Sequence, residues 1–246
     1  MMAFENKPGR LYQTLEQASY ETWSDGPFGR IGDEVNKTIS YYDKGPAVGL
    51  LFDFKIRQLT KDQKSLDDVM RFLYKEYYQK KKRGFTEEEL RNAFETVAGS
   101  SLAQEFEYVT TTKELDYPTY FSYAGLNIDT TTQALPGAYV GFTLREKEDS
   151  VFIANVDYES PGWNASIRRG QQVIKINGER SSVSLFNKTI NSARAGDKIR
   201  FSFFINNETK DIEVILGTKT EKGFKITSVG NPSPLQKQIL EDWLKG

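Results

Sequence analysis

The spacing of the apolar residues changes near Leu135-Pro136-Gly137, and this change constrains the fold more than any other feature of the 246-residue sequence. Before this point apolar residues recur every three to four positions, which is the spacing of amphipathic helices. After it they alternate, which is the spacing of half-buried strands. We therefore expect an α plus β chain with a helical domain at 1–134, a β domain at 135–218 and a C-terminal extension at 219–246.

Two helices are expected early in the helical domain. The apolar spacing predicts one amphipathic helix over 10–24 and a second, more apolar helix over 39–59. The density of large apolar groups in the second predicts burial on most of its sides. Pro46 lies inside it and lacks the N–H that would bond residue 42, so we expect a kink or a restart there.

Two further helices of this domain open with capping boxes. Ser65 and Asp68 form one such pattern, and Thr86 and Glu89 form the other. In each, the first side chain bonds a backbone N–H of the first turn while the acid bonds back to the cap. These pairs predict where the two helices begin.

The second half predicts a small β domain with two short helices. Asn177-Gly178 after an apolar run is a strong hairpin signal. A strand and a terminal helix are expected in the last thirty residues. The expected strands are 139–144, 150–156, 173–179, 198–205, 211–216 and 224–229, and the expected helices are 163–168, 184–193 and 235–244.

Composition excludes several kinds of site within this chain. There is no histidine and no cysteine, so no imidazole base, Ser-His-Asp triad, thiol nucleophile or Cys-ligated metal site can be built from it. The formal net charge of −1 argues against a nucleic-acid binder. No apolar run approaches the roughly 20 residues of a membrane span, and Met1–Arg10 lacks the apolar core of a signal peptide.

Three charged patterns each allow a structural and a functional interpretation. The run 80–83, Lys-Lys-Lys-Arg, is either a set of cations favoured at a helix C-terminus or a patch for an anionic partner. Asp53 and Arg57 are spaced for an ion pair on one helix or for orienting a charged substrate end. Asp67-Asp68 is explained better by a first helical turn than by a cation site.

A succession of short motifs in the β domain resembles a PDZ domain of the bacterial type. Their joint order over about 136–217 makes the resemblance specific, although Gln171 stands where these domains usually carry Asp. The motifs are Tyr139-Val140-Gly141-Phe142, Ser160-Pro161-Gly162-Trp163-Asn164-Ala165, Arg169-Gly170, Ile176-Asn177-Gly178 and Ala195-Gly196-Asp197.

The PDZ resemblance implies a peptide-binding groove. Such domains add a peptide as an extra strand at a sheet edge, while backbone N–H groups of a loop hold its terminal carboxylate. Here the loop would be Tyr139, Val140, Gly141 and Phe142. Phe186 and Ile190, four apart on a helix, would line the side-chain pocket or else belong to the core.

The helical domain resembles the glycyl aminopeptidase family of zinc metallopeptidases, which belong to the gluzincin clan and carry a C-terminal PDZ domain. The resemblance covers nearly the whole chain and implies the C-terminal part of a thermolysin-like catalytic domain. The residues that carry it are Pro8-Gly9-Arg10, Leu15–Ser19, Trp23, Ile39–Gly45, Phe52–Thr60, Ser65–Met70 and Gln236–Trp243.

The same resemblance implies one catalytic group. Related aminopeptidases use a tyrosine in a Tyr-x-Lys-Gly context to bind the oxyanion of the tetrahedral intermediate, and Tyr42-Asp43-Lys44-Gly45 matches that context. Without the resemblance, Tyr42 would be expected to pack in the core. Tyr41 points about 100° away on a helix and is the weaker candidate.

The resemblance implies a parent enzyme whose H-E-x-x-H zinc motif lies outside this sequence. We expect the parent to remove small N-terminal residues such as Gly or Ala from peptides. This chain would then supply no metal ligand or cofactor, one wall of the cleft and a PDZ groove for a peptide or protein C-terminus. The alternative is a stand-alone PDZ-containing binding or scaffold protein. Where the parent is located, and whether it is exported, stays open.

Overall fold

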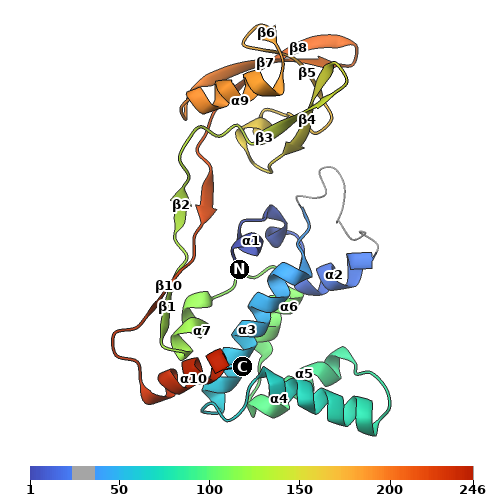
Figure 1. The fold of residues 1–246 in the computed structure, drawn as a ribbon. Helices are drawn as coiled ribbons and strands as arrows, with labels where there is room; N and C mark the ends of the chain where they lie inside the picture. The colour runs from blue at the N-terminus through green and yellow to red at the C-terminus, as the bar shows by residue number, and fades with distance from the viewer. Residues whose placement is uncertain (24–36, 246) are drawn as a thin grey trace. The chain divides into compact units, whose positions relative to one another are not determined.

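The computed structural model describes residues 1–23 and 37–245, and within them the chain forms two compact units (Figure 1). The helical unit holds residues 1–23, 38–131 and 223–245, and the β unit holds residues 37 and 132–222. The architecture is therefore α plus β, as predicted. The C-terminal extension expected at 219–246 is divided between the units. Residues 219–222 belong to the β unit, and residues 223–245 belong to the helical unit.

The helical unit is built around one long helix, α3, which contacts α1, α2, α4, α5, α6, α7 and α10. Phe54 and Ile56 of α3 have no exposed surface and lie at the centre of the core. Strands β1 and β10 pair antiparallel beside α7. The elements are α1 Met2–Glu5, η1 Pro8–Leu11, α2 Leu15–Tyr20, η2 Glu21–Trp23, α3 Tyr41–Leu59, α4 Leu66–Leu73, the π-helix η4 Tyr74–Lys80, α5 Glu87–Ala98, α6 Ala103–Thr110, α7 Tyr117–Tyr123, β1 Leu126–Asp129, β10 Lys225–Ser228 and α10 Pro234–Lys245.

Two predicted helices differ in detail from the structure. The expected single helix over 10–24 is three short pieces in the described residues, because Thr14 caps α2 with a capping box to Gln17 and so starts a new helix at Leu15. Helix α3 runs through Pro46 without a restart. Pro46 and Tyr42 are both exposed, so water can bond the carbonyl that the proline leaves without a helical donor.

Both predicted capping boxes are present. Ser65 and Asp68 bond reciprocally at the start of α4, and Thr86 and Glu89 do so at the start of α5. Each pair satisfies two backbone donors that a helix start leaves without partners. The two helix starts therefore follow from local sequence alone.

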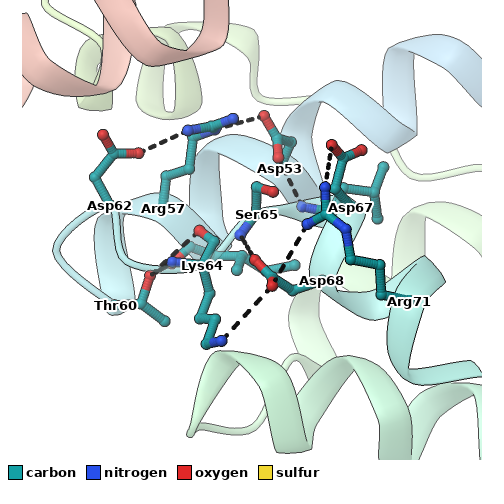
Figure 2. A network of polar contacts seen from close by, with 11 residues as sticks. Asp53, Arg57, Thr60, Asp62, Lys64, Ser65, Asp67, Asp68 and Arg71 are labelled. Carbon is teal, nitrogen blue, oxygen red and sulfur yellow. Dashed lines mark hydrogen bonds and ion pairs between the residues drawn. The ribbon is translucent and has the colours of Figure 1, made fainter. Parts of the chain in front are cut away.

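A network of ion pairs fixes the turn between α3 and α4 (Figure 2). Arg57 donates to Asp53 Oδ2 at 2.9 Å and to Asp62 Oδ1 at 2.7 Å. The other oxygen of Asp53 accepts the backbone N–H of Leu66 at 2.8 Å. The Asp62 side chain has no exposed surface and that of Arg57 is 12% exposed. Arg57 therefore holds two largely buried carboxylates, as the ion-pair interpretation of Asp53 and Arg57 predicts.

A second buried charge, that of Lys44, lies in the first turn of α3. Lys44 has no exposed surface, and its Nζ donates to the carbonyl of Thr111 at 3.2 Å and lies 5.5 Å from the centre of the Phe4 ring. Burial lowers the pKa of Lys44 to about 8, against the opposing charge of Glu5. Glu5 is also buried and accepts the hydroxyl of Tyr117 at 2.9 Å. These contacts join α1, α3 and α7.

The β unit contains a six-stranded sheet in the order β3-β4-β5-β7-β8, with β6 paired to β5. Strand β3 is an edge strand, and α9 contacts it. Strands β2 and β9 form a separate two-stranded ribbon. The elements are β2 Thr132–Ala134, β3 Phe142–Lys147, β4 Ser150–Val156, α8 Pro161–Asn164, β5 Gln172–Ile176, β6 Glu179–Arg180, α9 Val183–Ser192, β7 Lys198–Ile205, β8 Glu208–Ile215 and β9 Thr220–Lys222.

The core of the β unit follows from the predicted alternation. Along β4, Val151, Ile153 and Val156 are buried, and Phe201 and Phe203 of β7 have no exposed surface. Residues of one parity in a strand lie on one face of the sheet, so Val151 and Ile153 share a face. Val156 has the opposite parity, and it joins the same core because the β3–β4 pairing shifts register between Thr143 and Leu144. In the described part of the chain, no helix is long and apolar enough to cross a membrane.

The Lys44 site predicts how stability depends on pH. Since the pKa of Lys44 is about 8 in the folded chain and about 10.4 when unfolded, unfolding takes up a proton between these values. The free energy of unfolding should therefore rise by about 2 kcal/mol between pH 7.5 and 9.5. Urea unfolding of the wild type and of Lys44→Met at both pH values measures this change in the free energy of unfolding. The rise should be absent in Lys44→Met, and an equal rise in both would contradict the assignment.

The Arg57 network predicts a large loss of stability on truncation. Arg57→Ala leaves Asp53 and Asp62 without their cation, so the free energy of unfolding should fall by about 3–5 kcal/mol. Arg71→Ala is the matched control, because Arg71 is 62% exposed and its pairs with Asp67 and Asp68 are 3.4 and 3.6 Å long. Its loss should be at most about 1 kcal/mol. Equal losses in the two variants would refute the account.

Candidate functional site

A groove of about 270 Å³ opens beside the edge strand β3 and helix α9. All six residues predicted from the sequence to bind peptide line this groove. They come from the loop before β3, from β3 itself and from α9. The lining residues are Ala138, Tyr139, Val140, Gly141, Phe142, Thr143, Asp157, Phe186, Asn187, Ile190, Asn191 and Lys219.

The carbonyl groups of the loop before β3 are all bonded into the β unit. The carbonyl of Tyr139 accepts the N–H of Gly217 at 2.8 Å, and that of Val140 accepts the N–H of Gly162 at 2.8 Å. The carbonyl of Gly141 accepts the N–H of Asp157 at 2.7 Å and the hydroxyl of Ser160 at 3.2 Å. The loop is therefore fixed through its acceptors.

This fixation leaves backbone donors free. In a planar trans peptide the N–H points opposite to the preceding carbonyl, so the donors of Val140, Gly141 and Phe142 point away from those bonds. Within the described residues the N–H groups of Val140 and Gly141 have no acceptor. The Asp157-to-Gly141 bond makes Phe142 and Val156 a non-hydrogen-bonded pair of the ladder. Strand β4 therefore does not use the N–H of Phe142.

Gly141 is the residue that permits this loop geometry. Its φ is +80°, which lies in the left-handed region that favours glycine. A Cβ placed there would lie 1.9 Å from the Cβ of Ser160 and 2.2 Å from its Oγ. Any side chain would displace Ser160 and break the bond that holds the carbonyl of Gly141. The loop therefore requires glycine at this position.

The apolar part of the groove is made by Phe142, Phe186 and Ile190. The rings of Phe142 and Phe186 stack with centroids 5.4 Å apart. Phe186 is 6% exposed and belongs to the core, whereas Ile190 is partly buried against it. The two interpretations of Phe186 are therefore compatible, because one part of its surface supports the core and another lines the groove.

Two charged residues line the groove, and the sequence patterns did not indicate either. Asp157 accepts the hydroxyl of Tyr139 at 2.7 Å. Burial, and then this bond to the carboxylate, raises the pKa of Tyr139 well above its usual value. The Nζ of Lys219 lies 6.0 Å from the centre of the Tyr139 ring. Both residues are distant in sequence from the loop and reach it through strand pairing. The spacing of apolar residues therefore could not indicate them.

Tyr42 lies on the surface of the helical unit rather than in its core. Its side chain is 73% exposed, and its ring lies 4.2 Å from that of the half-buried Tyr41. The backbone N–H of Tyr42 donates to Ser40 Oγ at the start of α3. Asp43 pairs with Lys7 at 2.7 Å. The Tyr42 side chain also bonds that of Tyr41. Tyr42 is therefore accessible to a ligand, and the core-packing alternative is wrong.

The lysine-rich run is largely engaged by neighbouring acids. Lys80 pairs with Glu76, and Arg83 donates to both oxygens of Glu89 at 2.6 and 2.7 Å. The bond to Arg83 is the main cause that lowers the pKa of Glu89 to about 2. Lys81 lies 3.6 Å from the same carboxylate. These contacts support the structural interpretation of the run.

The described residues contain no cluster that fits a zinc site. No three His, Cys, Asp or Glu side chains gather there in a way that could hold a metal ion. Asp68 bonds the backbone N–H of Ser65, and Asp67 pairs with Arg71 (Figure 2). We assign no residue of this chain as a metal ligand.

Comparison with known proteins identifies the kind of domain that the β unit forms. Residues 138–216 match the PDZ domain family. The zinc metalloprotease RasP of Geobacillus kaustophilus (strain HTA426) is 29% identical over 94 residues, which cover 37% of this chain and 22% of that protein. The chain thus spans less than a quarter of the length of this curated relative.

A solved structure resembles nearly the whole chain. It is the aminopeptidase N family protein from Idiomarina loihiensis, which is 17% identical with a TM-score of 0.72. The match covers 98% of this chain and 42% of that chain. At this identity the match establishes the fold. The β unit is a PDZ domain, and the helical unit with this PDZ domain has the fold of part of an aminopeptidase N family protein.

Proposed function

We propose that this chain is the C-terminal part of a glycyl-aminopeptidase-like zinc metallopeptidase that removes small N-terminal residues, Gly or Ala, from peptides. The chain contributes one wall of the active-site cleft and a PDZ groove for a peptide C-terminus. The fold shared with an aminopeptidase N family protein supports the first role. The second role, peptide binding, is supported most strongly by the groove and its free backbone donors.

The groove has the chemistry needed for an extended peptide. Strand β3 is an open sheet edge, so a peptide can pair with it as another strand. The donors of Gly141 and Phe142 then point at the end of that peptide and suit its carboxylate. Phe142 and Ile190 provide an apolar surface for the last side chain. The expected ligand therefore has a free carboxylate and an apolar C-terminal residue.

Tyr42 is the group of this chain that we assign to the reaction. Its hydroxyl is on an exposed side chain and can donate a hydrogen bond. Negative charge develops on the carbonyl oxygen of a peptide bond under attack, and such a donor stabilises it. Zinc, held by other residues of the parent, would activate the attacking water.

The peptide proposal predicts that a free C-terminus is required. Fluorescein-labelled hexapeptides ending in Val, Ile or Phe should bind this chain, and their C-terminal amides should bind at least about tenfold more weakly, because the loop loses a charged acceptor. Fluorescence anisotropy measures both affinities. Gly141→Ala should abolish the difference between acid and amide. Gly137→Ala is the control, because Gly137 also has a positive φ but open space around an added Cβ, and it should keep the difference. Equal binding of acid and amide by the wild type would refute the groove assignment.

The peptidase proposal predicts the effect of removing one hydroxyl. In the full parent enzyme, Tyr42→Phe should lower kcat for a glycyl aryl amide by about 10²–10³ with a smaller change in KM. Tyr41→Phe removes the neighbouring hydroxyl that bonds Tyr42 and should lower kcat much less. This chain alone should show no aminopeptidase activity. Chelator-sensitive hydrolysis by this polypeptide, or equal effects of the two variants, would contradict the assignment.

A further inference from the structure

Lys219 lies where a second group for the ligand carboxylate would be needed. It lines the groove together with Tyr139–Phe142 and is the one cation among the described lining residues. Its carbonyl accepts the N–H of Leu135 at 2.8 Å, which fixes its backbone just before β9. Its side chain is 46% exposed and can therefore reorient.

The charges around the groove show what the Lys219 ammonium does without a ligand. Its Nζ pairs with Glu221 Oε1 at 3.3 Å, and Glu221 is 35% exposed. Asp157 is the other charged residue that lines the groove, and the hydroxyl of Tyr139 bonds it. The ammonium is therefore held by one exposed pair that a ligand can replace at small cost.

The backbone donors alone leave the ligand's charge uncompensated. An N–H group carries a partial charge, whereas a terminal carboxylate carries a full one. Asp157 also brings a second negative group to the same groove. A cation beside the loop offsets both, and charge-assisted bonds to a carboxylate are stronger than bonds between neutral groups. Lys219 is the described groove residue that can supply it.

We propose that Lys219 is a specificity-determining residue that exchanges its pair with Glu221 for the C-terminal carboxylate of the bound peptide. The inference rests on the proposed function, because it assigns a further residue to the same groove. The bound carboxylate then contacts both the loop before β3 and the segment before β9. Discrimination between a free acid and an amide comes partly from this side chain.

The test changes the peptide terminus and the Lys219 side chain, separately and together. Labelled hexapeptides ending in Val, as free acid and as amide, are titrated by anisotropy into the wild type and Lys219→Gln at low and moderate salt. Lys219→Gln should weaken binding of the acid about two- to fivefold and leave the amide unchanged, as expected for a single exposed ion pair. The effect should shrink as salt rises.

Two further variants complete the test. Glu221→Gln releases Lys219 and should strengthen binding of the acid about twofold. Lys188→Gln removes a cation of α9 that does not line the groove, and it should change neither affinity. Circular dichroism establishes that every variant is folded.

The outcomes separate this inference from the proposed function. If the wild type binds acid and amide equally, or binds neither, both are wrong. If the wild type prefers the acid and Lys219→Gln keeps the whole preference, the groove assignment holds and the Lys219 assignment is overturned. An equal loss for acid and amide also overturns it, because Lys219 would then only balance Asp157.

Discussion

The inward bonding of three consecutive carbonyls, from Tyr139 to Gly141, is the interaction on which the proposed site depends. Because the peptide group is planar and trans, fixing these acceptors also fixes the direction of the donors that follow them. The loop thereby presents backbone N–H groups at the end of the edge strand β3. Neither the edge nor the apolar pocket would select a chain terminus without them.

The same loop is connected to the segments that lead out of the PDZ domain. Tyr139 bonds Gly217 in both directions, and Leu135 donates to the carbonyl of Lys219. These bonds continue into the pairing of β2 with β9. The loop is therefore bonded directly to the segments that enter and leave the domain.

Sequence patterns predicted the local features well and the long-range ones poorly. The change of apolar spacing at 135–137, the capping boxes at Ser65 and Thr86, and the loop at 139–142 each depend on residues close in sequence. The β2–β9 ribbon and the place of Lys219 depend on pairing across about 85 residues, which no local pattern encodes. The exposure of Tyr42 likewise follows from how α3 packs and not from its apolar neighbours.

A nitrogen-15 NMR titration with a free-acid peptide ending in an apolar residue identifies the backbone amides that the ligand contacts. The largest shifts in amide resonances should fall on Val140, Gly141 and Phe142, continue along β3 and appear on the facing part of α9. Shifts confined to strands β5, β7 and β8, or the same pattern with an amidated peptide, would contradict the proposed binding site.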